Sequence, residues 1–149
     1  MTALPTKPVS AVVEFANYDD VALARESGSK SSRVRSTRVK AIVDKPAAFL
    51  LINEHVSKQL GLRMLDQRRH TTLADGREVV VEMAGPVGFR FRSHSTCMDV
   101  GLLPGDEPVR LGHIALSALR VKVEADKLAL DESPIRVPTL HFMCKDIPS

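Results

Sequence analysis

Few side chains in this sequence have the types and spacing that catalysis or metal binding requires. The histidines lie far apart along the chain, at His55, His70, His94, His113 and His141. No two of them are one helical turn apart, which is the spacing that lets two imidazoles on one helix face bind the same metal ion. We therefore predict no metal site and no cofactor.

Two other groups of reactive side chains give equally little chemistry. The stretch Ser93–Ser95 reads Ser-His-Ser, but neighbouring side chains on a strand point to opposite faces, which is poor geometry for a nucleophile and its base. Cys97 and Cys144 show neither metal-ligand nor disulfide spacing, so we expect free thiols, with Cys97 in the core or half-buried. Asp99 is expected to be an exposed strand residue.

A basic cluster is the clearest charge feature. Its cations are Lys30, Arg33, Arg35, Arg38 and Lys40. Such a run could contact a phosphate backbone, but no aromatic residue that could stack on bases stands beside it in the sequence. We favour a solvated loop that leads into an exposed strand edge. A basic β-module that binds nucleic acid through Arg33–Lys40 is the alternative.

The composition predicts one ordinary globular domain. The chain has 149 residues, no tryptophan, 4% aromatic residues and a formal net charge of +3. This length can bury a core without disulfides, and the core must be mainly aliphatic. The N-terminus lacks the apolar run of a signal peptide, and no apolar stretch approaches the length of a membrane span. We expect a cytoplasmic protein without a membrane partner.

Short apolar runs separated by turn signals predict an all-β barrel or sandwich. The Asp75-Gly76 pair between two strand-like runs is a strong hairpin signal, and Asp44–Ala47 is expected to form a turn. The expected strands are Ser10–Phe15, Arg38–Val43, Phe49–Ile52, Glu78–Met83, Val87–Phe91, Thr96–Leu103, Val109–Leu111, Val121–Glu124 and Leu128–Leu130.

Two short helices are expected beside the strands. Asn53 is a suitable N-cap for Glu54–Leu60, and Gly61 stands where a helix commonly ends. A second helix is predicted at Ile114–Leu119. The polar stretch Tyr18–Ser32 is expected to be a loop with one helical turn at most.

The order of several segments carries a resemblance to a known family. These segments are Asn17–Asp20, Leu23–Glu26, Val34–Ser36, Ala41–Asp44, His55–Leu62, Leu73–Arg77 and Val109–Gly112. Together they resemble the retropepsin-like (clan AA) bacterial aspartic proteases, over roughly Val12–Asp131.

The resemblance implies a small closed β-barrel that forms a homodimer and binds a peptide or protein segment in a cleft. Each subunit would supply one catalytic aspartate, which corresponds by position to Asp44. A second glycine turn would lie at Leu111 and Gly112. A flap hairpin would be formed by Leu73, Ala74, Asp75, Gly76 and Arg77.

The expected catalytic turn is altered in this chain. The family pattern is Asp-Thr-Gly or Asp-Ser-Gly, whereas this sequence reads Asp44-Lys45-Pro46-Ala47. The two carboxylates of such a site share one proton, and a nearby ammonium such as that of Lys45 would favour ionisation of both. Pro46 has no N–H to donate, and it restricts the residue before it.

We therefore expect a retropepsin-like homologue that is inactive or severely impaired, with peptide binding or dimerisation retained. The alternative within the family is an active homodimeric endopeptidase that uses Asp44 from each subunit. Residues 1–133 would form the domain, and residues 134–149 would form an edge strand or wrap around a partner.

Overall fold

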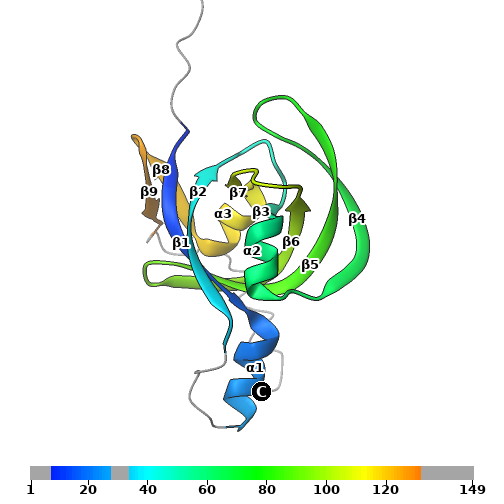
Figure 1. The fold of residues 1–149 in the computed structure, drawn as a ribbon. Helices are drawn as coiled ribbons and strands as arrows, with labels where there is room; N and C mark the ends of the chain where they lie inside the picture. The colour runs from blue at the N-terminus through cyan, green and yellow to red at the C-terminus, as the bar shows by residue number, and fades with distance from the viewer. Residues whose placement is uncertain (1–7, 28–33, 132–149) are drawn as a thin grey trace, which may run out of the picture.

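The structure, a computed structural model, describes residues 8–27 and 34–131 of the chain (Figure 1). Its first elements are β1 (Ser10–Asn17), α1 (Tyr18–Ser27), β2 (Ser36–Val43), β3 (Leu50–Asn53) and α2 (Glu54–Leu60). Three long strands follow, β4 (Met64–Thr72), β5 (Glu78–Phe91) and β6 (His94–Leu103). The last described elements are β7 (Val109–Leu111), α3 (His113–Leu119), β8 (Val121–Glu124) and β9 (Lys127–Leu130).

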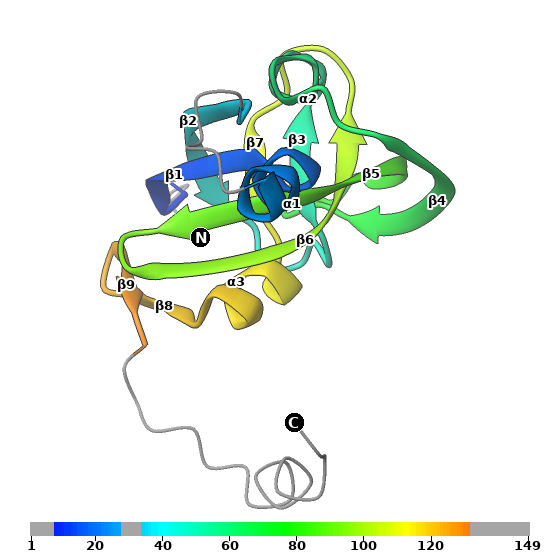
Figure 2. The same cartoon turned by 90° about the horizontal axis from the view of Figure 1, so that it is seen from below.

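Six strands close into a barrel, which confirms the predicted all-β class. Their order is β1-β2-β7-β3-β6-β5, and β5 returns to pair with β1. The β2–β7 and β3–β6 pairs are parallel, whereas the other pairs in the ring are antiparallel. β4 extends the sheet beyond β5, and β8 and β9 form a separate two-stranded sheet beside β1 (Figures 1 and 2).

Most side chains in the core of the barrel are aliphatic, as the composition predicts, and one aromatic pair lies among them. Phe15 and Phe89 are directly paired across the seam where β1 meets β5, and their ring centroids are 5.9 Å apart. Both side chains are fully buried, so the aromatic pair helps to hold the barrel closed. A smaller cluster that includes Leu51, Leu73 and Val81 fixes the β4–β5 hairpin to the barrel.

The helix α2 begins and ends where its sequence predicts. The Asn53 side chain accepts a hydrogen bond from the Val56 N–H, and Gly61 adopts a left-handed conformation at φ 59°. The expectation of a loop at Tyr18–Ser32 was wrong for its first ten residues, which form the helix α1, whereas residues 28–32 lie outside the described ranges. The start of α1 is stabilised by Asn17, whose side chain accepts from the Asp20 N–H at 3.0 Å.

Most strand predictions were confirmed, with different bounds. The predicted runs Glu78–Met83 and Val87–Phe91 form one continuous strand, β5. β4 was anticipated only at its last residues, because its side chains are mostly exposed and show no apolar alternation. The predicted strands Val121–Glu124 and Leu128–Leu130 are confirmed, and they pair as the hairpin β8–β9. The predicted C-terminal element 134–149 lies outside the described residues.

The start of α3 is hydrogen-bonded to the loop that follows the Asp44 turn. His113 N–H donates to the Ala47 carbonyl at 2.8 Å, and Ile114 N–H donates to the Ala48 carbonyl at 3.1 Å. A Cβ atom on Gly112 would lie 2.2 Å from the carbonyl oxygen of Phe49. Glycine is required here because two backbone segments touch.

A Gly112→Ala substitution should therefore destabilise the fold. Because the clash is with backbone atoms, we expect a loss of about 3 kcal/mol in the free energy of unfolding, measured by urea denaturation. Gly88→Ala is the matched control, because its added Cβ would meet its nearest neighbour at an ordinary 3.7 Å. Equal losses in the two variants would contradict the close-contact role of Gly112.

Candidate functional site

The candidate site is built around Asp44, which directly follows β2. Its N–H donates to the Leu111 carbonyl at 3.0 Å, so the residue is fixed to the end of β7. Its side chain is completely buried, with an exposed fraction of 0%. The residue begins a tight turn in which Ala47 N–H donates to the Asp44 backbone carbonyl at 3.2 Å and to Oδ1 at 3.1 Å.

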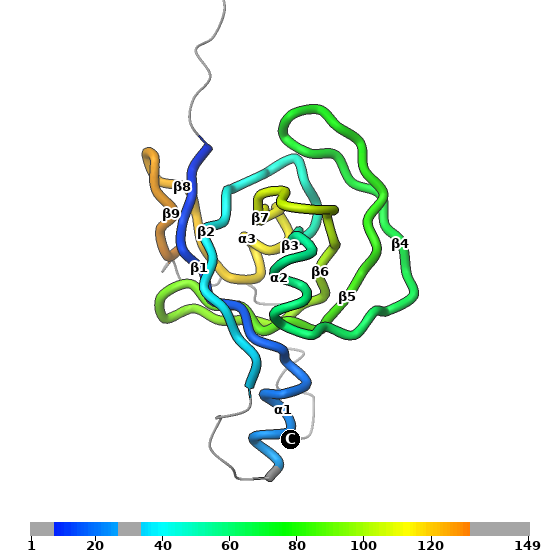
Figure 3. Tube along the Cα trace, in the orientation of Figure 1, coloured from blue at the N-terminus to red at the C-terminus, as the bar shows by residue number. Residues whose placement is uncertain are grey.

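The Asp44 carboxylate also binds two segments that are distant in sequence. Oδ2 accepts a hydrogen bond from Arg110 Nη1 at 2.8 Å and another from the Ala74 N–H at 3.1 Å. Ala74 belongs to the β4–β5 loop, which arches over the turn between β2 and β3 (Figure 3). One carboxylate therefore joins its own turn, the predicted flap hairpin and strand β7.

Arg110 is the counter-ion of this buried carboxylate. It lies in the middle of β7 and is opposite Ile42 of β2 and Leu51 of β3. Its side chain is 8% exposed, and its Nε atom has no hydrogen-bond partner among the described residues. A cation in a central strand loses its hydration, so the fold needs Asp44 beside it.

Two acids, Asp75 and Glu107, lie near the outer end of Arg110. Its Nη2 lies 3.8 Å from carboxylate oxygens of both Asp75 and Glu107. Arg77 links the same two acids, with nitrogen–oxygen distances of 2.9 Å to Asp75 and 2.7 Å to Glu107. Three acids and two arginines thus form one network between the hairpin tip and the β6–β7 connection.

The pKa values in this network follow the hydrogen bonds. The backbone N–H and guanidinium of Arg77 lower the pKa of Asp75, and the Arg77 side chain lowers the pKa of Glu107. The two acids in turn raise the pKa of Arg77. The network is fully formed only while both carboxyls are ionised.

The residues that stand in place of the expected Thr/Ser-Gly are not the ones that bind the Asp44 carboxylate. Lys45 and Pro46 are both exposed, and the side chain that binds Asp44 is Arg110. The Lys45 carbonyl lies 3.1 Å from His113 Nδ1. Pro46 provides no N–H, but the next residue, Ala47, donates one to the carboxylate. The altered turn therefore still holds the aspartate.

The predicted flap is fixed to the site. Leu73 is buried, its N–H donates to the Arg77 carbonyl at 2.8 Å, and its own carbonyl accepts from Gly76 at 2.9 Å. Gly76 has a φ of 91°, which explains the glycine at the hairpin tip. Thr71 Oγ1, at the base of the hairpin, accepts from the Ala48 N–H at 3.0 Å.

Other residues considered for chemistry lie elsewhere. His94 donates through Nδ1 to the Leu119 carbonyl at 2.9 Å, at the end of α3, so this nitrogen orients the ring. Asp99 is exposed, as predicted. The expectation that Cys97 lies in the core or is half-buried was wrong, because it is exposed on β6, opposite Gly88 of β5. Cys144 lies outside the described residues.

The described ranges contain no group of three metal-binding side chains. No helix in these ranges is long and apolar enough to cross a membrane. In the basic cluster, Arg35 pairs with Asp20 at 2.8 Å and Arg38 lies 3.5 Å from Glu14. Two of its cations thus have an acidic partner within the fold, whereas Lys30 and Arg33 lie outside the described residues.

Sequence reasoning missed Arg110 as a site residue. The signal was present, because Val109–Leu111 was predicted as a strand and its middle residue is charged. A charge in a buried strand requires a counter-charge.

No family model and no curated protein matches this chain. In the described structure the Asp44 carboxylate has no exposed surface, and it is bound by Arg110 and by the Ala47 and Ala74 N–H groups.

A double-mutant cycle should reveal this pair. Asp44→Asn and Arg110→Met each leave one partner buried without its counter-charge, so each should cost about 3–5 kcal/mol in the free energy of unfolding. The double variant should cost at least about 1 kcal/mol less than the sum. The exposed pair Asp19–Arg63 is the control and should contribute less than about 1 kcal/mol. Strict additivity at Asp44 and Arg110 would contradict the pairing.

Acid should weaken the same region. Arg77 lowers the pKa values of Asp75 and Glu107 in the folded state below their usual values, so the folded state binds fewer protons than the unfolded state at acidic pH. Their stabilisation is complete above these values and is lost as the pH falls through the lowered ones. Arg77→Gln should make the acid-induced loss of stability shallower in urea titrations between neutral and acidic pH. Arg69→Gln, at an exposed site on β4, should leave it unchanged.

Proposed function

We propose that this chain is a non-catalytic homologue of the retropepsin-like aspartic proteases, in which the ancestral catalytic position has become a structural brace. The observation that carries the proposal is the buried Asp44 carboxylate, which is bound by Arg110 at 2.8 Å. As a non-catalytic homologue, the protein would act by binding a peptide or protein segment, or a second copy of itself.

Two physical requirements of the protease reaction argue against retained activity. A catalytic dyad needs two carboxyls that share one proton beside a water molecule. In this chain the Asp44 side chain is wholly buried, and its Oδ2 accepts a hydrogen bond from the Arg110 guanidinium. The Ala74 N–H also lies on Oδ2, where a water molecule would have to bind.

The alternative of an active endopeptidase would require the hairpin and Arg110 to leave the carboxylate. Such a change would expose Leu73, which is 1% exposed, and would leave Arg110 without its buried partner. Both losses are costly. The alternative of a nucleic-acid module through Arg33–Lys40 is weakened by the internal pairing of Arg35 and Arg38.

Purified protein should show no cleavage of casein or of a peptide library that depends on Asp44, at acidic or at neutral pH. Asp44→Asn should have the same background as the unchanged protein, and so should the exposed control Asp99→Asn. Circular dichroism confirms that each variant is folded under the assay conditions. Cleavage that is inhibited by a pepstatin-type compound and lost only in Asp44→Asn would overturn the proposal.

A further inference from the structure

The first half of β1 has an open edge in the barrel wall. β1 pairs with β2 along Ser10–Ala16, but it pairs with β5 only along Glu14–Asn17. β5 ends at Phe91 and turns at Arg92, which has a φ of 54°. Among the described residues, Ser10–Val13 therefore form a ladder on one side only, and β9 lies near β1 without pairing with it.

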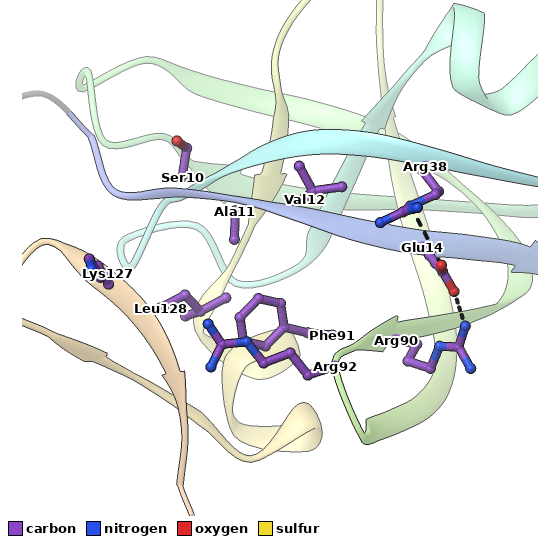
Figure 4. Close-up of a pocket in the computed structure, with 10 residues that line it drawn as sticks. All are labelled: Ser10, Ala11, Val12, Glu14, Arg38, Arg90, Phe91, Arg92, Lys127 and Leu128. Atoms are coloured by element: carbon purple, nitrogen blue, oxygen red, sulfur yellow. Dashed lines mark hydrogen bonds and ion pairs between the residues drawn. The ribbon is translucent and has the colours of Figure 1, made fainter.

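A hollow of about 450 Å³ lies beside this edge (Figure 4). Its base is apolar, because Phe91 and Leu128 are 6% and 3% exposed. Ala11 also lines the hollow, and Val12 at its rim is 53% exposed. The hollow thus combines apolar contacts with a free strand edge.

Positive charge surrounds the hollow. Four cations, Arg38, Arg90, Arg92 and Lys127, and one acid, Glu14, line it. Glu14 is directly opposite Arg38 in one ladder and Arg90 in the other, and it forms ion pairs with both (Figure 4). Arg92 lies over the Phe91 ring at 5.0 Å. Neither Arg92 nor Lys127 forms an ion pair with any residue in the described ranges.

We propose that this edge binds an extended, acidic peptide segment, which adds a short strand to β1 and places its carboxylates on Arg92 and Lys127. In strand addition, main-chain hydrogen bonds provide affinity, and side-chain contacts on alternate residues provide specificity. The unpaired edge supplies the first, whereas the apolar base and the excess of cations supply the second. The site is separate from Asp44 and does not depend on the fate of the catalytic turn.

A single-stranded nucleic acid is the competing ligand of the same charge. A larger hollow of about 690 Å³ shares Glu14, Arg38 and Arg90 and is also lined by Tyr18, which could stack on a base. The backbone edge favours the peptide, because a phosphodiester chain cannot continue a β-ladder. The two ligands are therefore distinguished by whether binding requires peptide N–H groups.

The test is fluorescence anisotropy with a labelled peptide of alternating Glu and Thr, about ten residues long. The protein should bind this peptide. It should bind the same peptide with alternate N-methylated amides, a Lys-Thr peptide and an oligothymidylate of equal charge at least about tenfold more weakly. The double variant Arg92→Gln, Lys127→Gln should also lose about tenfold or more in affinity for the Glu-Thr peptide.

The matched control is Lys58→Gln, Arg69→Gln, which removes the same charge from exposed positions on α2 and β4 and should keep full affinity. Equal binding of the methylated peptide would exclude strand addition. Tighter binding of the oligothymidylate would make the surface a nucleic-acid site instead. Absence of peptide binding, or unchanged binding in the Arg92, Lys127 double variant, would overturn the proposal.

Discussion

The ion pair between Asp44 and Arg110 is the constraint on which this structure depends. Arg110 is placed in a central strand, where its guanidinium has almost no contact with water. The cost of that placement is offset only if an anion is buried with it and is itself held by further hydrogen bonds. Asp44 meets both conditions, because its carboxylate is bound by Arg110 and by two backbone N–H groups.

This pair also explains why separate parts of the barrel hold together near the turn. Asp44 links β2 to β7 and to the β4–β5 hairpin, while Gly112 lets α3 pack against the loop that follows the turn. Leu73 then closes the apolar side of the same junction. A carboxylate that serves as such a junction already has its oxygens bound by groups of the fold itself.

Local signals in the sequence predicted much of the fold. Asn53 and Gly61 mark the ends of α2, and Asp75-Gly76 marks the hairpin, because these residues act through their own backbone geometry. α1 was missed because its start is stabilised from outside the segment, by Asn17, and its polar sequence has little apolar periodicity. The exposure of Cys97 was missed because it depends on which face of β6 points outward.

Asp44 was predicted as the candidate site residue, but its buried partner Arg110 was not foreseen. Lys45 stands next to Asp44 in the sequence, and yet it is exposed, whereas Arg110 is 66 positions away and forms the contact. Sequence proximity does not determine which charge is buried with which, because the register of β2 against β7 does. Only the closed barrel brings these two residues together.

The buried ion pair between Asp44 and Arg110 is tested most directly by NMR spectroscopy, through the rate at which the Arg110 guanidinium protons exchange with water. A buried and hydrogen-bonded guanidinium should give resolved Nη–H signals that exchange slowly, with contacts to the Ala74 N–H, and Asp44→Asn should abolish them. Arg110 signals that exchange as fast as those of the exposed Arg63 would contradict the buried ion pair and, with it, the structural role of Asp44.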